Sequence, residues 1–261
     1  IEETDKIMNA QKARGAQLDT GKMTDRVKAL VPVLIPLFIS AFRRAEELHA
    51  DGIEMDVHLL PDGSLAVHHD DQLGRTVNGT GSIYGYTFAQ LRELSAGAGF
   101  SPAYRDERVP SFRELLEFLQ GNDLVLNVEI KSNTGFLTGV EDAVVDMLRE
   151  YRMEGRCIIS SFNHFVLANI KKRAPELPVG ALYGFTLGKD MAEYAAANGF
   201  NALHADYHLV DRALVEKAHS LGIAVNVWTV DEEADMKYFI DLGVDYITTD
   251  YPERLQALLK K

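Results

Sequence analysis

Cysteine is almost absent from the chain, and this narrows the class of protein. Cys157 is the only cysteine, so an intramolecular disulfide is excluded and a reducing compartment is compatible. The first fifteen or so residues are polar throughout and lack the apolar core of a secretory signal. We therefore expect a cytoplasmic protein, with membrane association as the alternative.

Positive charge is also scarce. The 27 Lys and Arg residues are outnumbered by 39 Asp and Glu residues, which gives a formal net charge of −12. This balance argues against a nucleic-acid partner, because such binding relies on Lys and Arg replacing counterions on phosphates. A content of 46% apolar and 25% charged residues is typical of a soluble protein with a packed core. Disorder is therefore not expected.

Hydrophobic runs long enough to cross a membrane are not found. The longest apolar stretch covers residues 29–42 and is interrupted by Pro32 and Pro36; it is shorter than the ~20 residues that a spanning helix needs. Two states are open for it: a kinked or buried helix, or an irregular strand that runs into a helix. Membrane association through residues 24–49 is not favoured.

From about residue 51 onward, short apolar runs alternate with amphipathic helical stretches, which is typical of βα units around a parallel sheet. A further run that contains His69 follows the first strand through a Pro-Asp-Gly turn, which predicts a hairpin. The expected strands cover residues 52–57, 124–130, 157–162, 179–184, 202–207, 224–229 and 246–250. These units make an α/β barrel whose first strand is atypical or missing.

Acidic residues gather at two strand ends. Alternate side chains share one face of a strand, so Glu54 and Asp56 point together, as do Glu129 and Lys131. In a (β/α)8 barrel the carboxyl ends of the strands carry the active site. Three carboxylates suit a hard divalent metal such as Mg²⁺ or Ca²⁺, although solvated carboxylates are the plain alternative. Lys131 is either a phosphate ligand or a salt-bridge partner.

Other candidate residues lie at the same end of the expected barrel. His69 follows the hairpin and could act as a general acid or base near neutral pH. Trp228 ends a strand and either walls a substrate pocket or packs in the core, while His204 could line the barrel. Asp250 ends the last strand, where capping of the final helix is the favoured role.

Ordered motifs across residues 41–261 resemble the glycerophosphodiester phosphodiesterase family. They read AFRRAEELHADGIEMDVHLLPDGSLAVHHDDQLGRT, VPSFRELLEF, NVEIK, IISSF, VNVWTV and GVDYITTDYP. The resemblance implies a TIM barrel with a small insertion after the second strand. It also implies that Glu54, Asp56 and Glu129 bind a divalent metal, Mg²⁺ or Ca²⁺, that His69 is one of two catalytic histidines, and that Lys131 contacts the phosphate.

The beginning of the chain departs from this family. Its members open with a strand that ends in His-Arg-Gly, followed by Pro-Glu-Asn-Thr, and neither motif is present. Residues 7–48 instead resemble the transmembrane T component of energy-coupling-factor transporters, whose first coupling motif matches residues 13–15. We therefore divide the chain into an atypical helical segment, 1–45, and a phosphodiesterase-like barrel, 46–261.

The function implied by the resemblance is hydrolysis of glycerophosphodiesters to glycerol 3-phosphate and an alcohol. Loss of the two opening motifs predicts impaired turnover. The first alternative is a non-catalytic barrel that binds metal and a phosphate ester, and the second is a membrane-associated module anchored by the N-terminal segment. Transport is not expected, because only a small part of the transporter is present.

Overall fold

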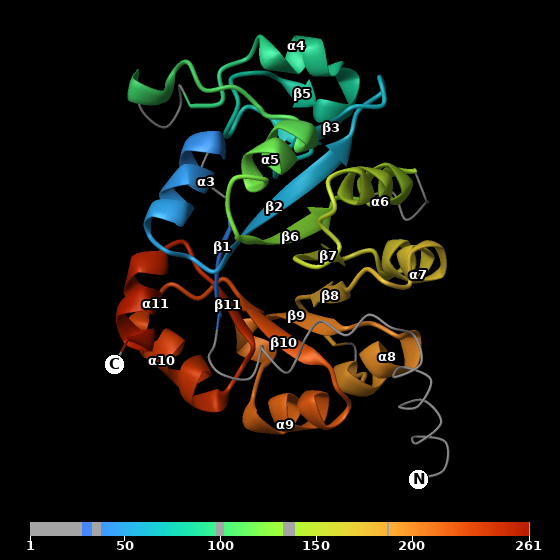
Figure 1. Cartoon of the computed structure of the whole chain (residues 1–261), viewed down its shortest axis with the longest axis vertical. Helices are drawn as coiled ribbons and strands as arrows, with labels where there is room; N and C mark the ends of the chain where they lie inside the picture. Colours follow the sequence, from blue (N-terminus) through green and yellow to red (C-terminus); the bar gives the residue numbers. More distant parts are fainter. Residues whose placement is uncertain (1–27, 33–37, 98–101, 133–138, 187, 261) are drawn as a thin grey trace.

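The structure is a computed structural model that describes residues 28–32, 38–97, 102–132, 139–186 and 188–260. Eight parallel strands close into a barrel, and the helices form a ring around it (Figure 1). The barrel closes because the first strand, β1 (Lys28–Pro32), pairs with both β11 (Tyr246–Thr248) and β2 (Gly52–Leu59). The expected α/β barrel is confirmed.

The remaining elements follow in alternation. The other barrel strands are β6 (Val125–Ile130), β7 (Cys157–Ser161), β8 (Val179–Tyr183), β9 (Ala202–Asp206) and β10 (Ala224–Trp228). The outer helices are α3 (Phe38–Glu47), α5 (Phe112–Leu119), α6 (Val140–Glu150), α7 (His164–Arg173), α8 (Met191–Asn198), α9 (Arg212–Ser220), α10 (Glu233–Leu242) and α11 (Pro252–Leu259), and the short helix η3 (Tyr207–Leu209) precedes α9.

The apolar stretch near the N-terminus divides between two elements. Its first residues belong to β1, in which Pro32 is the register partner of Glu54, and its last residues belong to α3, which buries Phe42 and Ala45. Residues 1–27 and 33–37 lie outside the described part, so the division of the chain at residue 45 stays a prediction. Among the described helices, none combines the length and apolar character of a membrane span.

The expected hairpin after β2 is present and begins a small insertion. The strand β3 (Leu65–Val67) pairs antiparallel with β2, and the chain continues through β4 (Gln72–Leu73), β5 (Gly81–Ser82), η1 (Ile83–Gly85), α4 (Phe88–Arg92) and η2 (Pro102–Tyr104). These elements lie together at the top of Figure 1, beyond the ring of helices. Because β3 runs back along β2, the residues that follow β3 lie beside Asp56 of β2.

The two faces of the barrel strands differ in chemistry. Outward residues such as Ile53, Met55 and Val57 are buried in the main core beneath the helices. Inward residues near the amino ends of the strands form a separate apolar cluster, Ile158, Ala202, Ala224 and Tyr246. This cluster fills the barrel at that end, so an internal pocket can open only toward the carboxyl ends.

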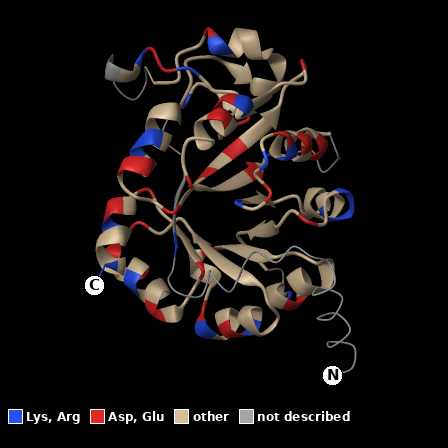
Figure 2. Ribbon diagram, viewed as in Figure 1, with Lys and Arg blue, Asp and Glu red and all other residues tan. Residues whose placement is uncertain are grey.

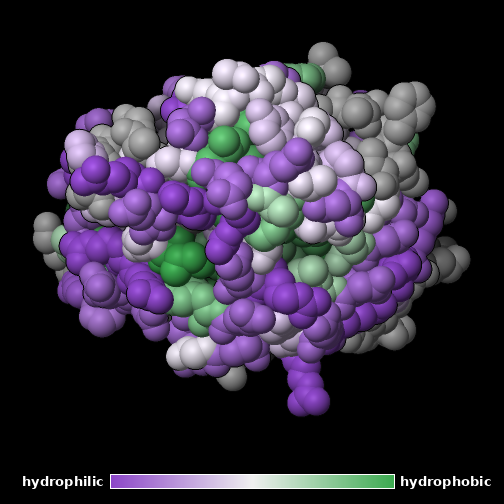
Figure 3. Space-filling view, turned by 90° about the horizontal axis from the view of Figure 1, so that it is seen from above, coloured by the Kyte–Doolittle hydropathy of each residue, from purple (hydrophilic) through white to green (hydrophobic). Residues whose placement is uncertain are grey.

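Charge is distributed in a way that singles out the barrel interior. Most acidic and basic residues lie on the outer helices and loops, but acidic positions also occur on β2 inside the ring (Figure 2). The face seen from above is mainly hydrophilic, and hydrophilic side chains divide its hydrophobic areas (Figure 3). Burying an acidic residue inside a barrel costs free energy unless its carboxylate has a partner. The acidic residues of β2 are therefore candidates for a functional site.

Candidate active site

Three carboxylates converge at the carboxyl ends of β2 and β6. Strand alternation turns Glu54 and Asp56 inward, and Glu129 is the register partner of Asp56 on the neighbouring strand. One carboxylate oxygen of each residue lies within 4.8 Å of the others. Asp56 is 4% exposed and Glu129 is 8% exposed. Asp56 and Glu129 are therefore too buried to be ordinary solvated carboxylates, and Glu54 is half-buried beside them.

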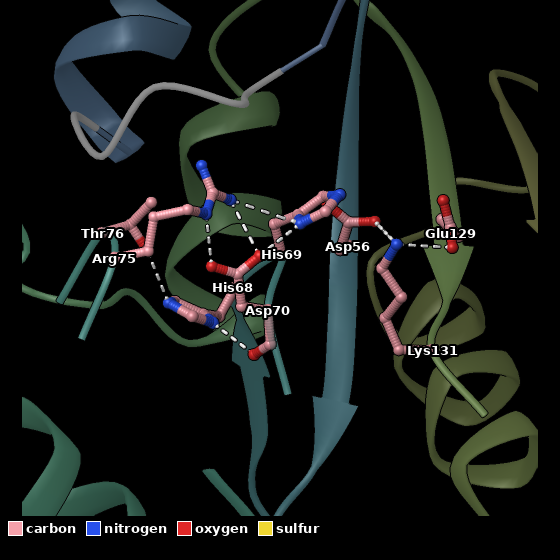
Figure 4. A network of polar contacts seen from close by, with 8 residues as sticks. All are labelled: Asp56, His68, His69, Asp70, Arg75, Thr76, Glu129 and Lys131. Carbon is pink, nitrogen blue, oxygen red and sulfur yellow. Dashed lines mark hydrogen bonds and ion pairs between the residues drawn. The ribbon is translucent and has the colours of Figure 1, made fainter. Parts of the chain in front are cut away.

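Lys131 lies directly between two of these carboxylates. Its Nζ is 2.8 Å from Oδ1 of Asp56 and 2.7 Å from Oε1 of Glu129 (Figure 4). Burial by itself would lower the pKa of Lys131, but Asp56 and Glu129 raise it above its ordinary value. Lys131 is therefore a charged ammonium group, and in the absence of a ligand its role is that of a salt-bridge partner.

The lysine does not fully offset the negative charge. Burial, followed by Asp56 and Glu129, raises the pKa of Glu54 well above its ordinary value. Burial and Asp56 likewise raise the pKa of Glu129 to about 8. Carboxyl groups with raised pKa values take up protons near neutral pH unless another cation is close. The donor set, three carboxylate oxygens without His or Cys, fits a hard divalent cation.

His69 is held beside the carboxylates by an acidic neighbour. Its Nδ1 is 2.7 Å from Oδ1 of Asp70, and Arg75 binds both oxygens of Asp70 at 2.7 and 2.8 Å (Figure 4). The hydrogen bonds from Arg75 hold the pKa of Asp70 below its usual range. A carboxylate that accepts from Nδ1 leaves Nε2 of the ring available for proton transfer.

These residues border one pocket inside the carboxyl end of the barrel. The cavity has a volume of about 210 Å³, and Glu54, Asp56, Glu129, Lys131, His69 and Trp228 all line it. Trp228 packs edge-to-face on Phe162 with ring centroids 5.8 Å apart, and its Nε1 donates to the backbone oxygen of His204 at 3.0 Å. The structure therefore brings together every residue that the sequence singled out as a site residue.

Some pocket residues could not be identified from the sequence. Phe162, Asn127 and Asn226 line the cavity, but a strand pattern alone does not distinguish them from packing residues. Asp70 was also missed, although its place directly after His69 was a usable signal.

The prediction that Asp250 caps the final helix is wrong. The N-cap residue of α11 is Tyr251, and Oδ1 of Asp250 is buried without a hydrogen-bond partner.

Comparison with known proteins gives a match over most of the chain. Residues 39–254 match the model of the glycerophosphoryl diester phosphodiesterase family. A glycerophosphodiester phosphodiesterase from Caldanaerobacter subterraneus subsp. tengcongensis is 40% identical over 223 residues, which cover 85% of this chain and 91% of that protein.

Solved structures of phosphodiesterases are also similar to this chain. A phosphodiesterase from Oleispira antarctica, in complex with the product sn-glycerol-3-phosphate, has a TM-score of 0.84 and 25% identity, with coverage of 90% of this chain and 98% of that one. A putative glycerophosphoryl diester phosphodiesterase from Silicibacter pomeroyi DSS-3 has a TM-score of 0.80 and 26% identity, with coverage of 90% and 93%.

The N-terminal segment has a different relative. Residues 1–51 match the model of the cobalt transport protein family. Over 48 residues the chain is 60% identical to the energy-coupling factor transporter transmembrane protein EcfT of Listeria innocua, a match that covers 18% of each protein. The resemblance of this segment to a transporter fragment is therefore confirmed.

The raised pKa of Glu129 predicts a pH-dependent stability in the metal-free chain. The contribution of a carboxyl group with a raised folded-state pKa is present below its unfolded value of 4.5 and is lost as the pH rises through about 8. We expect the free energy of unfolding by urea, measured with a chelator, to fall across this interval.

Glu129→Gln should flatten this pH dependence, because an amide does not titrate. Glu216→Gln, an exposed position on α9, serves as the control and should keep the slope of the unsubstituted chain. Identical slopes in all three proteins would show that Glu129 titrates normally.

Proposed function

The chain belongs to the glycerophosphoryl diester phosphodiesterase family, and from this premise we propose that it hydrolyses glycerophosphodiesters with the help of a divalent metal. The products are glycerol 3-phosphate and an alcohol. The observation that carries the proposal is the pocket in which three carboxylates, Lys131 and His69 converge. The sequence match to a named phosphodiesterase over 85% of the chain supports the same reaction.

Glu54, Asp56 and Glu129 would hold the metal, Mg²⁺ or Ca²⁺. Their mutual approach within 4.8 Å and their burial suit one small hard cation better than three separate roles. When bound, the cation supplies positive charge to the phosphoryl oxygens of the substrate.

Lys131 would bind the phosphate, and His69 would transfer a proton. Lys131, already held in the pocket by Asp56 and Glu129, places its ammonium group where a phosphate oxygen can accept from it. Water adds to the phosphorus as the bond to the leaving oxygen breaks. His69 donates a proton to that oxygen, and the proton that the attacking water loses passes to solvent, from which His69 is reprotonated. Asp70 orients the imidazole through its Nδ1, so Asp70 is a positioning residue.

Trp228 and Phe162 would form the apolar wall of the substrate pocket. Both rings line the cavity, and the edge-to-face contact fixes their relative orientation. The bound product sn-glycerol-3-phosphate in the Oleispira antarctica relative supports a ligand of this size. A small phosphodiester is therefore the substrate class that we propose.

Turnover is proposed to be impaired. No histidine occurs among residues 28–37, where the family resemblance predicts His-Arg-Gly, so the attacking water lacks a second acid/base group. Losing such a group costs roughly 10²- to 10⁴-fold in rate.

A non-catalytic barrel that binds metal and a phosphate ester is the second candidate, and binding of glycerol 3-phosphate without detectable hydrolysis would favour it.

Metal-dependent hydrolysis of glycerophosphocholine tests the proposal. With Mg²⁺ or Ca²⁺ we expect slow release of choline, which a chelator abolishes and Glu129→Ala reduces by at least about tenfold, because the metal loses one of its three ligands. Glu216→Ala on α9 should react as the unsubstituted chain does. Equal rates in Glu129→Ala and the unsubstituted chain would contradict the enzymatic role.

Replacement of His69 tests the proton donor. His69→Asn should lower kcat by roughly 10²- to 10⁴-fold, the usual range for loss of a general acid, while KM changes little. His208→Asn is the matched control, since this histidine is largely exposed on η3 outside the pocket. An unchanged kcat in His69→Asn would remove His69 from the mechanism.

A further inference from the structure

The pocket extends sideways from Glu54 and one layer deeper into the barrel. Strand registers place Ser160, His204 and Thr248 at the same height as Glu54, because inward side chains of alternate strands form one layer. The layer beneath contains Asn127, Gly180 and Asn226. Such layers usually consist of bulky branched apolar residues, whereas these are small or polar.

Most of these polar groups are already paired with one another. Ser160 Oγ donates to Oδ1 of Asn127 at 3.0 Å, and Thr248 Oγ1 donates to Oδ1 of Asn226 at 3.1 Å. These pairs satisfy groups that would otherwise be buried without partners. They need no ligand to explain them.

His204 differs from these residues. Its side chain lines the cavity and is 1% exposed, and its Nδ1 is buried without a hydrogen-bond partner. Burial lowers the pKa of His204 to about 3, so the ring is neutral at pH 7 and offers one donor and one acceptor. Leaving a buried nitrogen without a partner is unfavourable, and a ligand hydroxyl could supply that partner.

The position of the His204 ring depends on a glycine on the neighbouring strand β8. A Cβ atom at Gly180 would lie 2.5 Å from Nε2 of His204, closer than any real contact allows. Glycine at this position therefore leaves the space that the ring occupies. A larger residue at position 180 would therefore displace the imidazole ring without replacing His204.

We propose that His204 recognises a hydroxyl group of the glycerol moiety of the substrate, and so determines specificity for glycerol over apolar alcohols. The proposal rests on the hydrolytic function above, in which metal ligands and Lys131 hold the phosphate. A neutral imidazole that offers a donor and an acceptor matches a hydroxyl, which is both. The glycerol end then points into the polar layers, and the leaving alcohol points toward the mouth beside His69.

Calorimetric binding with Mg²⁺ present tests the assignment without requiring turnover. The two probes are sn-glycerol 3-phosphate and n-propyl phosphate, which has the same carbon chain but lacks both hydroxyls. The unsubstituted chain should bind sn-glycerol 3-phosphate more tightly. His204→Leu should weaken that binding by about threefold to tenfold, the range of one net hydrogen bond, and leave binding of n-propyl phosphate unchanged.

Gly180→Ala should give the same selective loss, because the added methyl group displaces the imidazole. It replaces His204→Leu as the test if that variant does not fold, and His208→Leu on η3 is the matched control. Equal weakening of both probes, or an unchanged preference for sn-glycerol 3-phosphate, would overturn the role of His204. If neither probe binds the unsubstituted chain, the proposed function fails together with this inference.

Discussion

Repulsion among three closely spaced carboxylates, two of them buried, is the interaction on which the pocket depends. Glu54, Asp56 and Glu129 bring three negative charges within 4.8 Å, and Lys131 supplies one positive charge at 2.7 and 2.8 Å. If all three carboxylates are ionised, the net charge of the four groups is −2, which one divalent cation would neutralise. Without that cation the carboxyl groups must retain protons, as the raised pKa values of Glu54 and Glu129 indicate.

The barrel provides the geometry that this cluster requires. Parallel pairing of β2 with β6 places Asp56 opposite Glu129, and strand alternation turns both side chains inward. The antiparallel strand β3 then returns along β2, so that His69 reaches the same end of the barrel. The apolar cluster at the other end closes the interior, and as a result these groups share one pocket.

Much of this could be predicted from the sequence, and the exceptions have physical causes. The period-two pattern in β2 and β6 was sufficient to place Glu54, Asp56, Glu129 and Lys131 on one face. The prediction that Asp250 caps α11 was wrong, because the helix begins at Pro252 and its N-cap residue is Tyr251. Burial of His204 against Gly180 could not be foreseen, since it depends on the register between the neighbouring strands β8 and β9.

The start of the described chain supplies a barrel strand but none of the candidate metal ligands. The strand β1 closes the barrel and contains no histidine, and the three candidate metal ligands all lie on β2 and β6. The central claim is therefore the metal site. Calorimetric titration with Mg²⁺ or Ca²⁺ should show one ion bound per chain, and no binding in Glu129→Gln or Asp56→Asn. Equal binding by the variants and the unsubstituted chain would contradict it.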